Sequence, residues 1–404
     1  MNDSGEKLAP VSGSERIREI DMLRGFALFG VLLVNTQMFN DTLISFPSSP
    51  FDYAEPVNQW TALAIQIIAT GKFYTLFSFL FGLGFFMFME RLEDKGLKPE
   101  PVFRRRLFFL LLFGLLHMFF FWYGDILTSY AITGFILMSF YRHDPAQIKK
   151  WIVILLVIST LLFSSILTMQ YAASGTPGIT GFAEKTVRLY QQGNLLETIR
   201  FRLQHESMIV FANLVFWIPK ILSLFLAGLY AGKIGLFRNL RQKKPFIRTI
   251  WIRSGVIGWT LTAYYVAHGL GFDPFNPIAA RFMAEASKEI STVALCLFYI
   301  TSLLLLWQRP AWRNLLSVFE GVGRLALTHY LTQSLILSLI FYGHGLGLMH
   351  RIPLWQGVII SIAIYSIQVI ISQIYMKHFH QGPMEALWRK GTYGKKTADA
   401  ESTV

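Results

Sequence analysis

The sequence predicts an all-α polytopic membrane protein with about ten transmembrane helices. Hydrophobic residues make up 53% of its 404 residues, and aromatic residues make up 15%. Only 15% of the residues are charged, whereas soluble proteins contain about a quarter. Lipid accepts apolar side chains on every face of a helix, which an aqueous core cannot do. The one cysteine, Cys296, has no partner, so no disulfide or thiolate metal site is expected.

Ten apolar segments predict the membrane-spanning helices. A bilayer core about 30 Å thick requires roughly 20 mostly apolar residues per helix. In chain order, the segments that approach this length are 23–39, 73–89, 107–122, 126–141, 151–171, 208–230, 250–267, 290–307, 325–342 and 355–376.

Basic residues between these segments predict the topology. Ten spans place both chain ends on one side, and we expect that side to be cytoplasmic. The inner segments then hold 27 of the 37 Lys and Arg residues and the outer segments hold 7. Such an excess is the positive-inside pattern. The net charge of +13 therefore indicates insertion and contact with anionic lipid of the bilayer, and no nucleic-acid partner is expected.

The polar segments define the domain boundaries. Residues 1–15 are rich in Ser and Gly and are predicted to be a disordered cytoplasmic tail. Residues 16–394 are predicted to form a single transmembrane helical domain, and residues 395–404 a second cytoplasmic tail. The one long outer loop, 173–206, is expected to contain short helices. It either caps an outward-facing cavity or simply connects two spans.

Ionisable and polar side chains inside a span are candidate functional residues, because they cost several kcal/mol unless they face a cavity or a partner. Asp21 and Arg24 can pair on one face of the first span. Asn35 lies eleven residues after Arg24 on nearly the same face, about 16 Å along the helix. One possibility is that the three residues line a path across the membrane. The alternative is that Asp21 and Arg24 anchor the orientation of the first span, and that Asn35 only bonds a neighbouring helix.

Lys72 and Asp125 carry opposite charges at the same predicted depth near the outer face, and we expect them to form an ion pair there. His117 lies halfway through the third span. It is a candidate proton carrier, because imidazole titrates near neutral pH. The alternative is a hydrogen-bonded packing residue.

The ninth span is the most polar of the ten. Arg324 and Thr328 are four residues apart and are predicted to share a helix face, as are His329 and Gln333. An arginine fork suits a phosphate or carboxylate, and a histidine can move a proton. These residues form either a substrate site or a buried structural network. No phosphate-binding loop, zinc signature or nucleophile elbow is present, so neither a metal nor a bound cofactor is expected.

Five ordered segments resemble the domain-of-unknown-function 418 family of bacterial inner-membrane proteins, often called YeiB-like. They span the chain from 16 to 394 and read RIREIDMLRGFALFGVLLVN (16–35), GKFYTLFSFLFG (71–82), GDILTSYA (124–131), GRLALTHYLTQS (323–334) and GPMEALWRKGTYG (382–394). The resemblance implies a multi-pass location in the bacterial inner (plasma) membrane.

The resemblance also implies a distant similarity to transmembrane acyltransferases, which pass an acyl group from cytoplasmic acyl-CoA to an acceptor at the outer face. Those enzymes carry an arginine, ten residues and then a presumed catalytic histidine on the first span. Here the arginine is Arg24, but Asn35 occupies the histidine position. An amide cannot accept the proton that a general base must take. Either His117 or His329 substitutes from another helix, or the scaffold has another use.

Three functions follow from these observations. The first is acyl transfer in a polar cavity formed by the first, second, third and ninth helices. Arg24 and Arg324 would bind anionic groups of an acyl-CoA donor, and His329 or His117 would handle the proton. The second is transport or export of a small anionic or amphipathic solute through the same cavity. The third is a structural or assembly role. The sequence does not fix the substrate or the oligomeric state.

Overall fold

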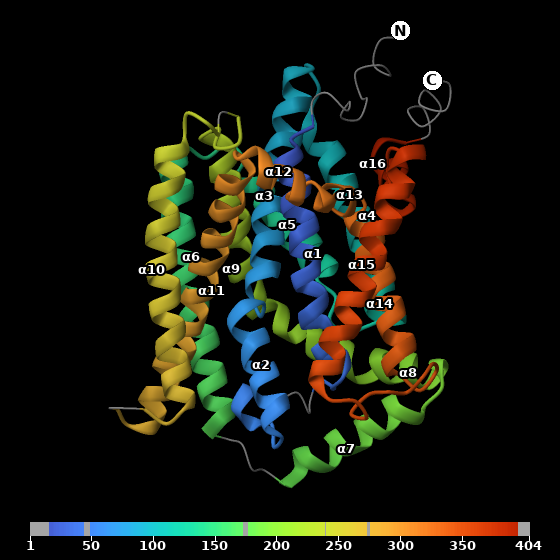
Figure 1. Cartoon of the computed structure of the whole chain (residues 1–404). Helices are drawn as coiled ribbons and strands as arrows, with labels where there is room; N and C mark the ends of the chain where they lie inside the picture. Colours follow the sequence, from blue (N-terminus) through green and yellow to red (C-terminus); the bar gives the residue numbers. More distant parts are fainter. Residues whose placement is uncertain (1–15, 44–48, 173–176, 239, 273–274, 395–404) are drawn as a thin grey trace.

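Most of the helices run side by side along one common direction in the computed structural model, and a few short helices lie across the ends of the bundle (Figure 1). The structure describes residues 16–43, 49–172, 177–238, 240–272 and 275–394, and both predicted tails lie outside these ranges. Every regular element in this part of the chain is helical. The elements are α1 (Arg18–Phe39), η3 (Pro50–Asp52), α2 (Pro56–Ile68), α3 (Lys72–Asp94), α4 (Pro99–Phe120), α5 (Leu127–Leu137), η4 (Met138–Phe140), α6 (Pro145–Ala172), α7 (Pro177–Gln192), α8 (Leu195–Phe201), η5 (Arg202–Glu206), α9 (Ser207–Lys233), α10 (Lys244–Gly269), α11 (Pro277–Trp307), α12 (Pro310–Leu316), α13 (Val318–Arg324), α14 (Ala326–Phe341), α15 (Leu354–His378) and α16 (Pro383–Tyr393).

Most residues of each of the ten predicted segments are helical, and six helical stretches in the described part of the chain are long and apolar enough to cross a membrane. These are Arg18–Phe39, Pro56–Asp94, Pro145–Gln170, Leu195–Lys233, Pro277–Trp307 and Leu354–His378. Two further apolar helices, α5 and α14, have 11 and 16 residues, which is less than one bilayer thickness. The helical class is therefore confirmed, whereas ten crossings and the orientation of the chain stay predictions.

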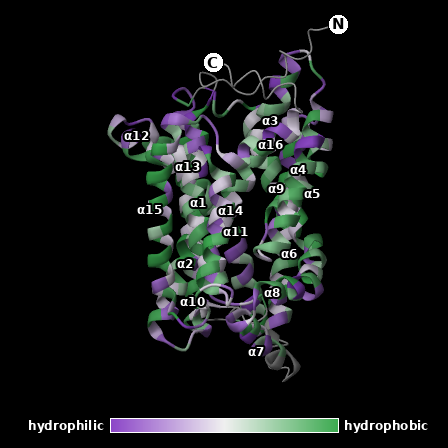
Figure 2. Cartoon of the chain, turned by 90° about the vertical axis from the view of Figure 1, so that its right-hand side faces the viewer, coloured by the Kyte–Doolittle hydropathy of each residue, from purple (hydrophilic) through white to green (hydrophobic). Residues whose placement is uncertain are grey.

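The helices are mostly apolar along the middle of the bundle. Hydrophobic residues cover the central part of the helices, and hydrophilic residues gather toward the two ends (Figure 2). The apolar window of α6 is only 17% buried inside the protein. Val153, Val157 and Leu161 on that helix are each more than half exposed. Large apolar side chains on an outward face are typical of a surface that contacts lipid.

Glycines bring pairs of helices into backbone contact. A Cβ atom added at Gly82 of α3 would lie 1.9 Å from the carbonyl oxygen of Phe225 in α9. One added at Gly323 of α13 would lie 1.8 Å from the carbonyl oxygen of Asp21 in α1. Small residues commonly allow such close approach between membrane helices. The contact between α1 and α13 places Asp21, Arg24 and Arg324 at the same end of the bundle.

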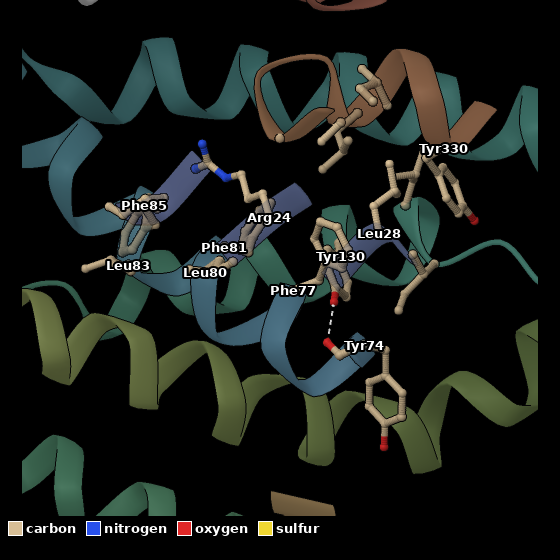
Figure 3. A pocket seen from close by; sticks show the side chains of 18 of the residues that line it. Arg24, Leu28, Tyr74, Phe77, Leu80, Phe81, Leu83, Phe85, Tyr130 and Tyr330 are labelled. Atoms are coloured by element: carbon tan, nitrogen blue, oxygen red, sulfur yellow. Dashed lines mark hydrogen bonds between the residues drawn. The ribbon is translucent and has the colours of Figure 1, made fainter. Parts of the chain in front are cut away.

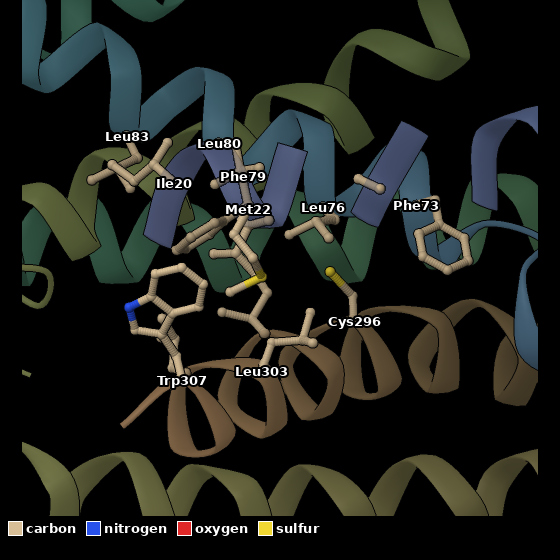
Figure 4. Packing of buried hydrophobic residues seen from close by; sticks show 14 of the residues in the cluster. Ile20, Met22, Phe73, Leu76, Phe79, Leu80, Leu83, Cys296, Leu303 and Trp307 are labelled. Carbon is tan, nitrogen blue, oxygen red and sulfur yellow. The ribbon is translucent and has the colours of Figure 1, made fainter. Parts of the chain in front are cut away.

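A buried apolar cluster joins α1, α3 and α11 (Figure 4). Met22 of α1, Leu76 of α3 and Leu304 of α11 are at most 1% exposed within it. Cys296 is buried in the same cluster. This packing fixes the position of α1 against α3, and these two helices provide much of the cavity wall described below.

The predicted loop 173–206 contains α7, α8 and the π-helical turn η5 within its described part, as its mixed-polarity sequence indicated. It packs on the loop that joins α14 to α15. The amide of Gly343 donates to the carbonyl oxygen of Tyr190 at 2.7 Å, and the Gln191 side chain donates to the carbonyl oxygen of Met349 at 2.8 Å. α7 and α8 lie at the opposite end of the bundle from α16 (Figure 1).

Candidate functional site

A cavity of about 1010 Å³ lies between the helices. Its walls come from α1, α3, α4, α5, α9, α13, α14 and α16. Five of the predicted site residues line it, namely Asp21, Arg24, Asn35, Asp125 and Arg324. Residues far apart in the chain therefore share one cavity.

One end of the cavity is basic. Eight Arg and Lys side chains line it, and most come from the ends of helices that meet there: Arg16, Arg24, Arg91, Lys95, Arg106, Arg238, Arg324 and Arg389. The acidic residues near them are Asp21, Glu90, Asp94 and Glu385. The excess of positive charge favours an anionic group at this end.

Asp21 holds two arginines at the basic end. Its Oδ2 atom accepts from Arg16 Nε at 2.5 Å, and its Oδ1 atom accepts from Arg24 Nη1 at 3.2 Å. The pair of Asp21 and Arg24 predicted from their spacing is therefore present, with Arg16 added. One carboxylate between two guanidinium groups leaves a net positive charge. Gly84 of α3 lies opposite, because a Cβ atom there would be 3.5 Å from Arg24 Nη2.

The middle of the cavity is apolar. Arg24 lies at one end of a row of side chains from α3 that includes Phe81 and Phe77, and Tyr130 of α5 lies farther along the row (Figure 3). The Tyr130 hydroxyl donates to the carbonyl oxygen of Tyr74 at 2.9 Å. This bond satisfies the only polar atom of the Tyr130 side chain, so its ring can form an apolar wall. A basic end followed by an apolar chamber suits a molecule with an anionic head and an apolar chain.

Asp125 faces the cavity and bonds to His117 behind it. His117 Nδ1 and Asp125 Oδ1 are 3.0 Å apart, and both side chains are fully buried. Asp125 Oδ2 accepts from the amide of Thr128 at 2.7 Å. His117 Nε2 has no hydrogen-bond partner among the described residues. His117 therefore orients the Asp125 carboxylate, and a carboxylate at a cavity wall can accept and release a proton.

Lys72 lies away from the cavity, and the predicted ion pair with Asp125 does not form. Its ammonium donates to the carbonyl oxygen of Gln66 at 2.6 Å. It lies near the bonded pair of Lys220 and Glu289 instead. Depth along the membrane was the only basis of that expectation, and depth does not decide which helices are neighbours.

The ninth predicted span is not one continuous helix. Leu325 has φ −106° and ψ 24°, which ends α13 before α14 begins. The expected shared face of Arg324 and Thr328 is therefore wrong. Glu385 of α16 accepts from the amides of Leu327 and Thr328 at 2.7 and 3.1 Å, and from the Thr328 hydroxyl. This carboxylate satisfies amides at the new helix start.

Three predicted site residues of α14 contact neighbouring helices rather than the cavity. Thr328 binds Glu385, as described above. His329 Nε2 lies 2.7 Å from Ser372 Oγ, and Gln333 Nε2 donates to Gln368 Oε1 at 2.8 Å. The last two bonds join α14 to α15. No histidine occurs among the described residues that line the cavity. The described part of the chain also holds no group of three or more His, Cys, Asp or Glu residues arranged to bind a metal.

The cavity-lining residues of two helices were not predicted from the sequence. α9 adds apolar wall residues that include Leu214 and Trp217, and α16 adds Trp388 and Arg389. α16 follows the last predicted span, and the sequence assigns it no position relative to the cavity. The helical spacing of Glu385, Trp388 and Arg389 was the sequence feature that could have indicated a helix facing the cavity. Arg106 belongs to the basic run Arg104 to Arg106, which by itself indicates only topology.

Comparisons with known proteins find relatives whose names call them uncharacterised. A family model described as "Protein of unknown function (DUF418)" matches residues 231–395. "Uncharacterized protein YxaH" of Bacillus subtilis (strain 168) is 32% identical over 403 residues, covering 96% of each chain. "Uncharacterized protein YeiB" of Escherichia coli (strain K12) is 27% identical over 389 residues, covering 94% of this chain and 96% of its own. No solved structure matches the chain significantly.

Proposed function

The chain belongs to the DUF418 family, and from that premise we propose that it is an acyltransferase of the bacterial inner membrane. It takes an acyl-CoA thioester from the cytoplasmic side and passes the acyl group to an acceptor at the outer face. The observation that carries this proposal is the basic end of the cavity, which leads directly into an apolar chamber beside Asp125. The positive-inside pattern supports a cytoplasmic position for the basic end.

The basic end binds the anionic part of the donor. Arg24 and Arg324 reach the cavity from two different helices, and planar guanidinium groups bind phosphate oxygens in pairs. Arg24 and Asn35 are eleven residues apart on α1, about 16 Å of helix. An extended linker between the head and the reacting carbonyl therefore spans from the basic end to the level of Asn35.

Asp125 is the residue that handles the proton, with His117 as its orienting partner. The acceptor oxygen attacks the thioester carbonyl carbon, so a carbon–oxygen bond forms and the carbon–sulfur bond breaks. Asp125 takes the proton from the acceptor hydroxyl and returns it to the leaving thiolate, which departs as free CoA. The hydrogen bond from His117 Nδ1 stabilises the carboxylate while it is charged.

Replacing Asp125 by asparagine is expected to lower the rate of acyl transfer by about 10²–10⁴-fold, the usual contribution of general acid–base catalysis. The Asp125→Asn side chain keeps the shape and an oxygen but cannot take the proton. The measurement is transfer of a radiolabelled acyl group from acyl-CoA to lipid or glycan fractions in proteoliposomes. Donor affinity is expected to stay near the wild-type value, because Asp125 lies beyond the basic end. Wild-type activity in Asp125→Asn would remove Asp125 from the mechanism.

One observation favours transport as a second candidate function. The residues that line the cavity extend from the basic end to Asn35, four residues before the end of α1, and to Gly71, directly before the start of α3. No histidine occurs among the described lining residues. A path of that length can serve a solute that crosses unchanged. Counterflow of labelled acyl-CoA or free fatty acid into proteoliposomes, without a transferred product, would favour transport over acyl transfer.

A further inference from the structure

Arg106 is held differently from Arg16, Arg24 and Arg238 at the basic end. It lines the cavity from α4 but forms no ion pair with a described carboxylate. Its guanidinium carbon instead lies 3.7 Å from the centre of the Trp388 ring and 5.6 Å from that of Phe88. An arginine stacked on an aromatic ring keeps its in-plane N–H groups available for another partner. Arg16, Arg24 and Arg238, by contrast, each bond to a carboxylate.

The C-terminal helix α16 holds Arg106 in this position. The Trp388 indole N–H donates to the carbonyl oxygen of Arg106 at 2.9 Å, so the two residues are joined twice. Arg105 Nη2 donates to the carbonyl oxygen of Gly391 at 2.9 Å. A Cβ atom at Gly391 would lie 2.7 Å from the Phe109 ring, so the two helices are in close contact. α16 therefore fixes the orientation of a cavity-lining guanidinium.

The charges at this end also indicate what kind of anion fits. Eight basic side chains line it against four acidic ones, which leaves an excess of four positive charges. Asp21 is shared between two arginines, and Glu385 is committed to the start of α14. A single carboxylate or phosphodiester would leave most of this charge uncompensated, whereas a polyphosphate head would balance it.

We propose that Arg106, held against Trp388 of α16, binds a polyphosphate head group, and that α16 is part of the ligand-binding site. This inference rests on the proposed function for the identity of the ligand, because CoA carries such a head. The position of Arg106 and the charge at the basic end point to a polyphosphate and do not depend on the rest of the CoA molecule. Single-phosphate amphipaths and acylated pantetheine, which lacks the phosphates, are therefore poor ligands.

The test measures binding of free CoA, acyl-CoA, acyl-pantetheine and inorganic tripolyphosphate to the purified full-length protein in lipid nanodiscs. Arg106→Gln is expected to weaken CoA and tripolyphosphate about tenfold to a hundredfold, the loss typical of a charge-assisted hydrogen bond. Arg106→Lys keeps the charge without the planar fork and should give an intermediate loss. Arg104→Gln is the matched control, since Arg104 is an exposed neighbour on α4 that is absent from the cavity lining.

Two variants of Trp388 test the part played by α16. Trp388→Phe keeps an aromatic surface under Arg106 and is expected to bind CoA within a fewfold of wild type. Trp388→Leu removes the ring and should weaken CoA binding as much as Arg106→Gln does, with little added loss in the double variant. Equal losses in the two Trp388 variants would overturn the assignment of the ring as the support of Arg106.

The outcomes also separate this inference from the proposed function. Arg106-dependent binding of CoA or tripolyphosphate without any acyl transfer would support the inference and count against the enzyme. Wild-type CoA and tripolyphosphate affinity in Arg106→Gln would overturn the inference even if acyl transfer were measured. Equal affinity of the wild type for acyl-pantetheine and acyl-CoA would also overturn it, as would failure of the folded wild type to bind any of the phosphates.

Discussion

Replacing Glu289 by glutamine is expected to lower the free energy of unfolding by about 3–5 kcal/mol, the cost of breaking a buried ion pair. Glu289 of α11 accepts a hydrogen bond from Lys220 of α9, whose side chain is only 1% exposed. Lys288 and Lys72 also lie close enough for electrostatic attraction to Glu289. Without the carboxylate, an ammonium group stays buried beside two further cations. Unfolding in mixed detergent, followed by tryptophan fluorescence, measures the loss.

Glu100→Gln provides the matched control. Glu100 pairs with Arg142 at 3.4 Å, but their side chains are 35% and 84% exposed, and such surface pairs contribute little. The double variant Lys220→Met/Glu289→Gln removes both buried charges and is expected to recover part of the lost stability. If Glu289→Gln and Glu100→Gln have the same free energy of unfolding, the ion pair of Lys220 and Glu289 does not stabilise the fold as described.

Replacing Gly323 by alanine is expected to destabilise the protein by about 1–3 kcal/mol and to disrupt the basic end of the cavity. The new Cβ atom would lie 1.8 Å from the carbonyl oxygen of Asp21 and 2.9 Å from the amide nitrogen of Gly25. Both atoms belong to the backbone of α1, so the helices must move apart. That movement separates Arg324 from Asp21 and Arg24. The thermal midpoint and the affinity for CoA are expected to fall together.

Gly84→Ala is the control for this change. Gly84 also lies inside a helix that lines the cavity, but the one atom within 4 Å of its added Cβ is Arg24 Nη2, at 3.5 Å. Alanine in a helix interior is otherwise more favourable than glycine by up to about 1 kcal/mol. The thermal midpoint of Gly84→Ala should therefore equal or exceed that of wild type. A Gly323→Ala protein as stable as Gly84→Ala would contradict the close contact of α1 with α13.

The helical class could be predicted from the sequence because lipid leaves the backbone few alternatives. A chain in hydrocarbon must satisfy its amides internally, so long apolar runs become helices. The interruption at Leu325 could not be predicted in this way. It coincides with a carboxylate on Glu385, 60 residues farther along the chain, that caps the start of α14. The hydropathy of the segment 325–342 gives no information about that contact.

The candidate site was predicted in part. Asp21, Arg24 and Asn35 share one helix, so helical spacing placed them correctly along one wall. Arg324 and Asp125 also line the cavity, as polar residues inside apolar segments indicated. The sequence did not reveal that α16 folds back to the cavity or that His329 faces Ser372 of α15. These facts depend on which helices are neighbours, and periodicity does not specify neighbours.

The most direct test of the account is the affinity of the wild-type protein for CoA and for acyl-CoA thioesters of increasing chain length, measured in nanodiscs. An anionic head in the basic end and a chain in the apolar chamber predict that affinity rises by about fourfold per added CH₂ group until the chamber is full. Arg24→Gln should lower every affinity by a similar factor and leave this dependence on chain length unchanged. Equal affinity for CoA and for every acyl-CoA, or no binding by the folded protein, would contradict the binding of an acyl-CoA donor in this cavity.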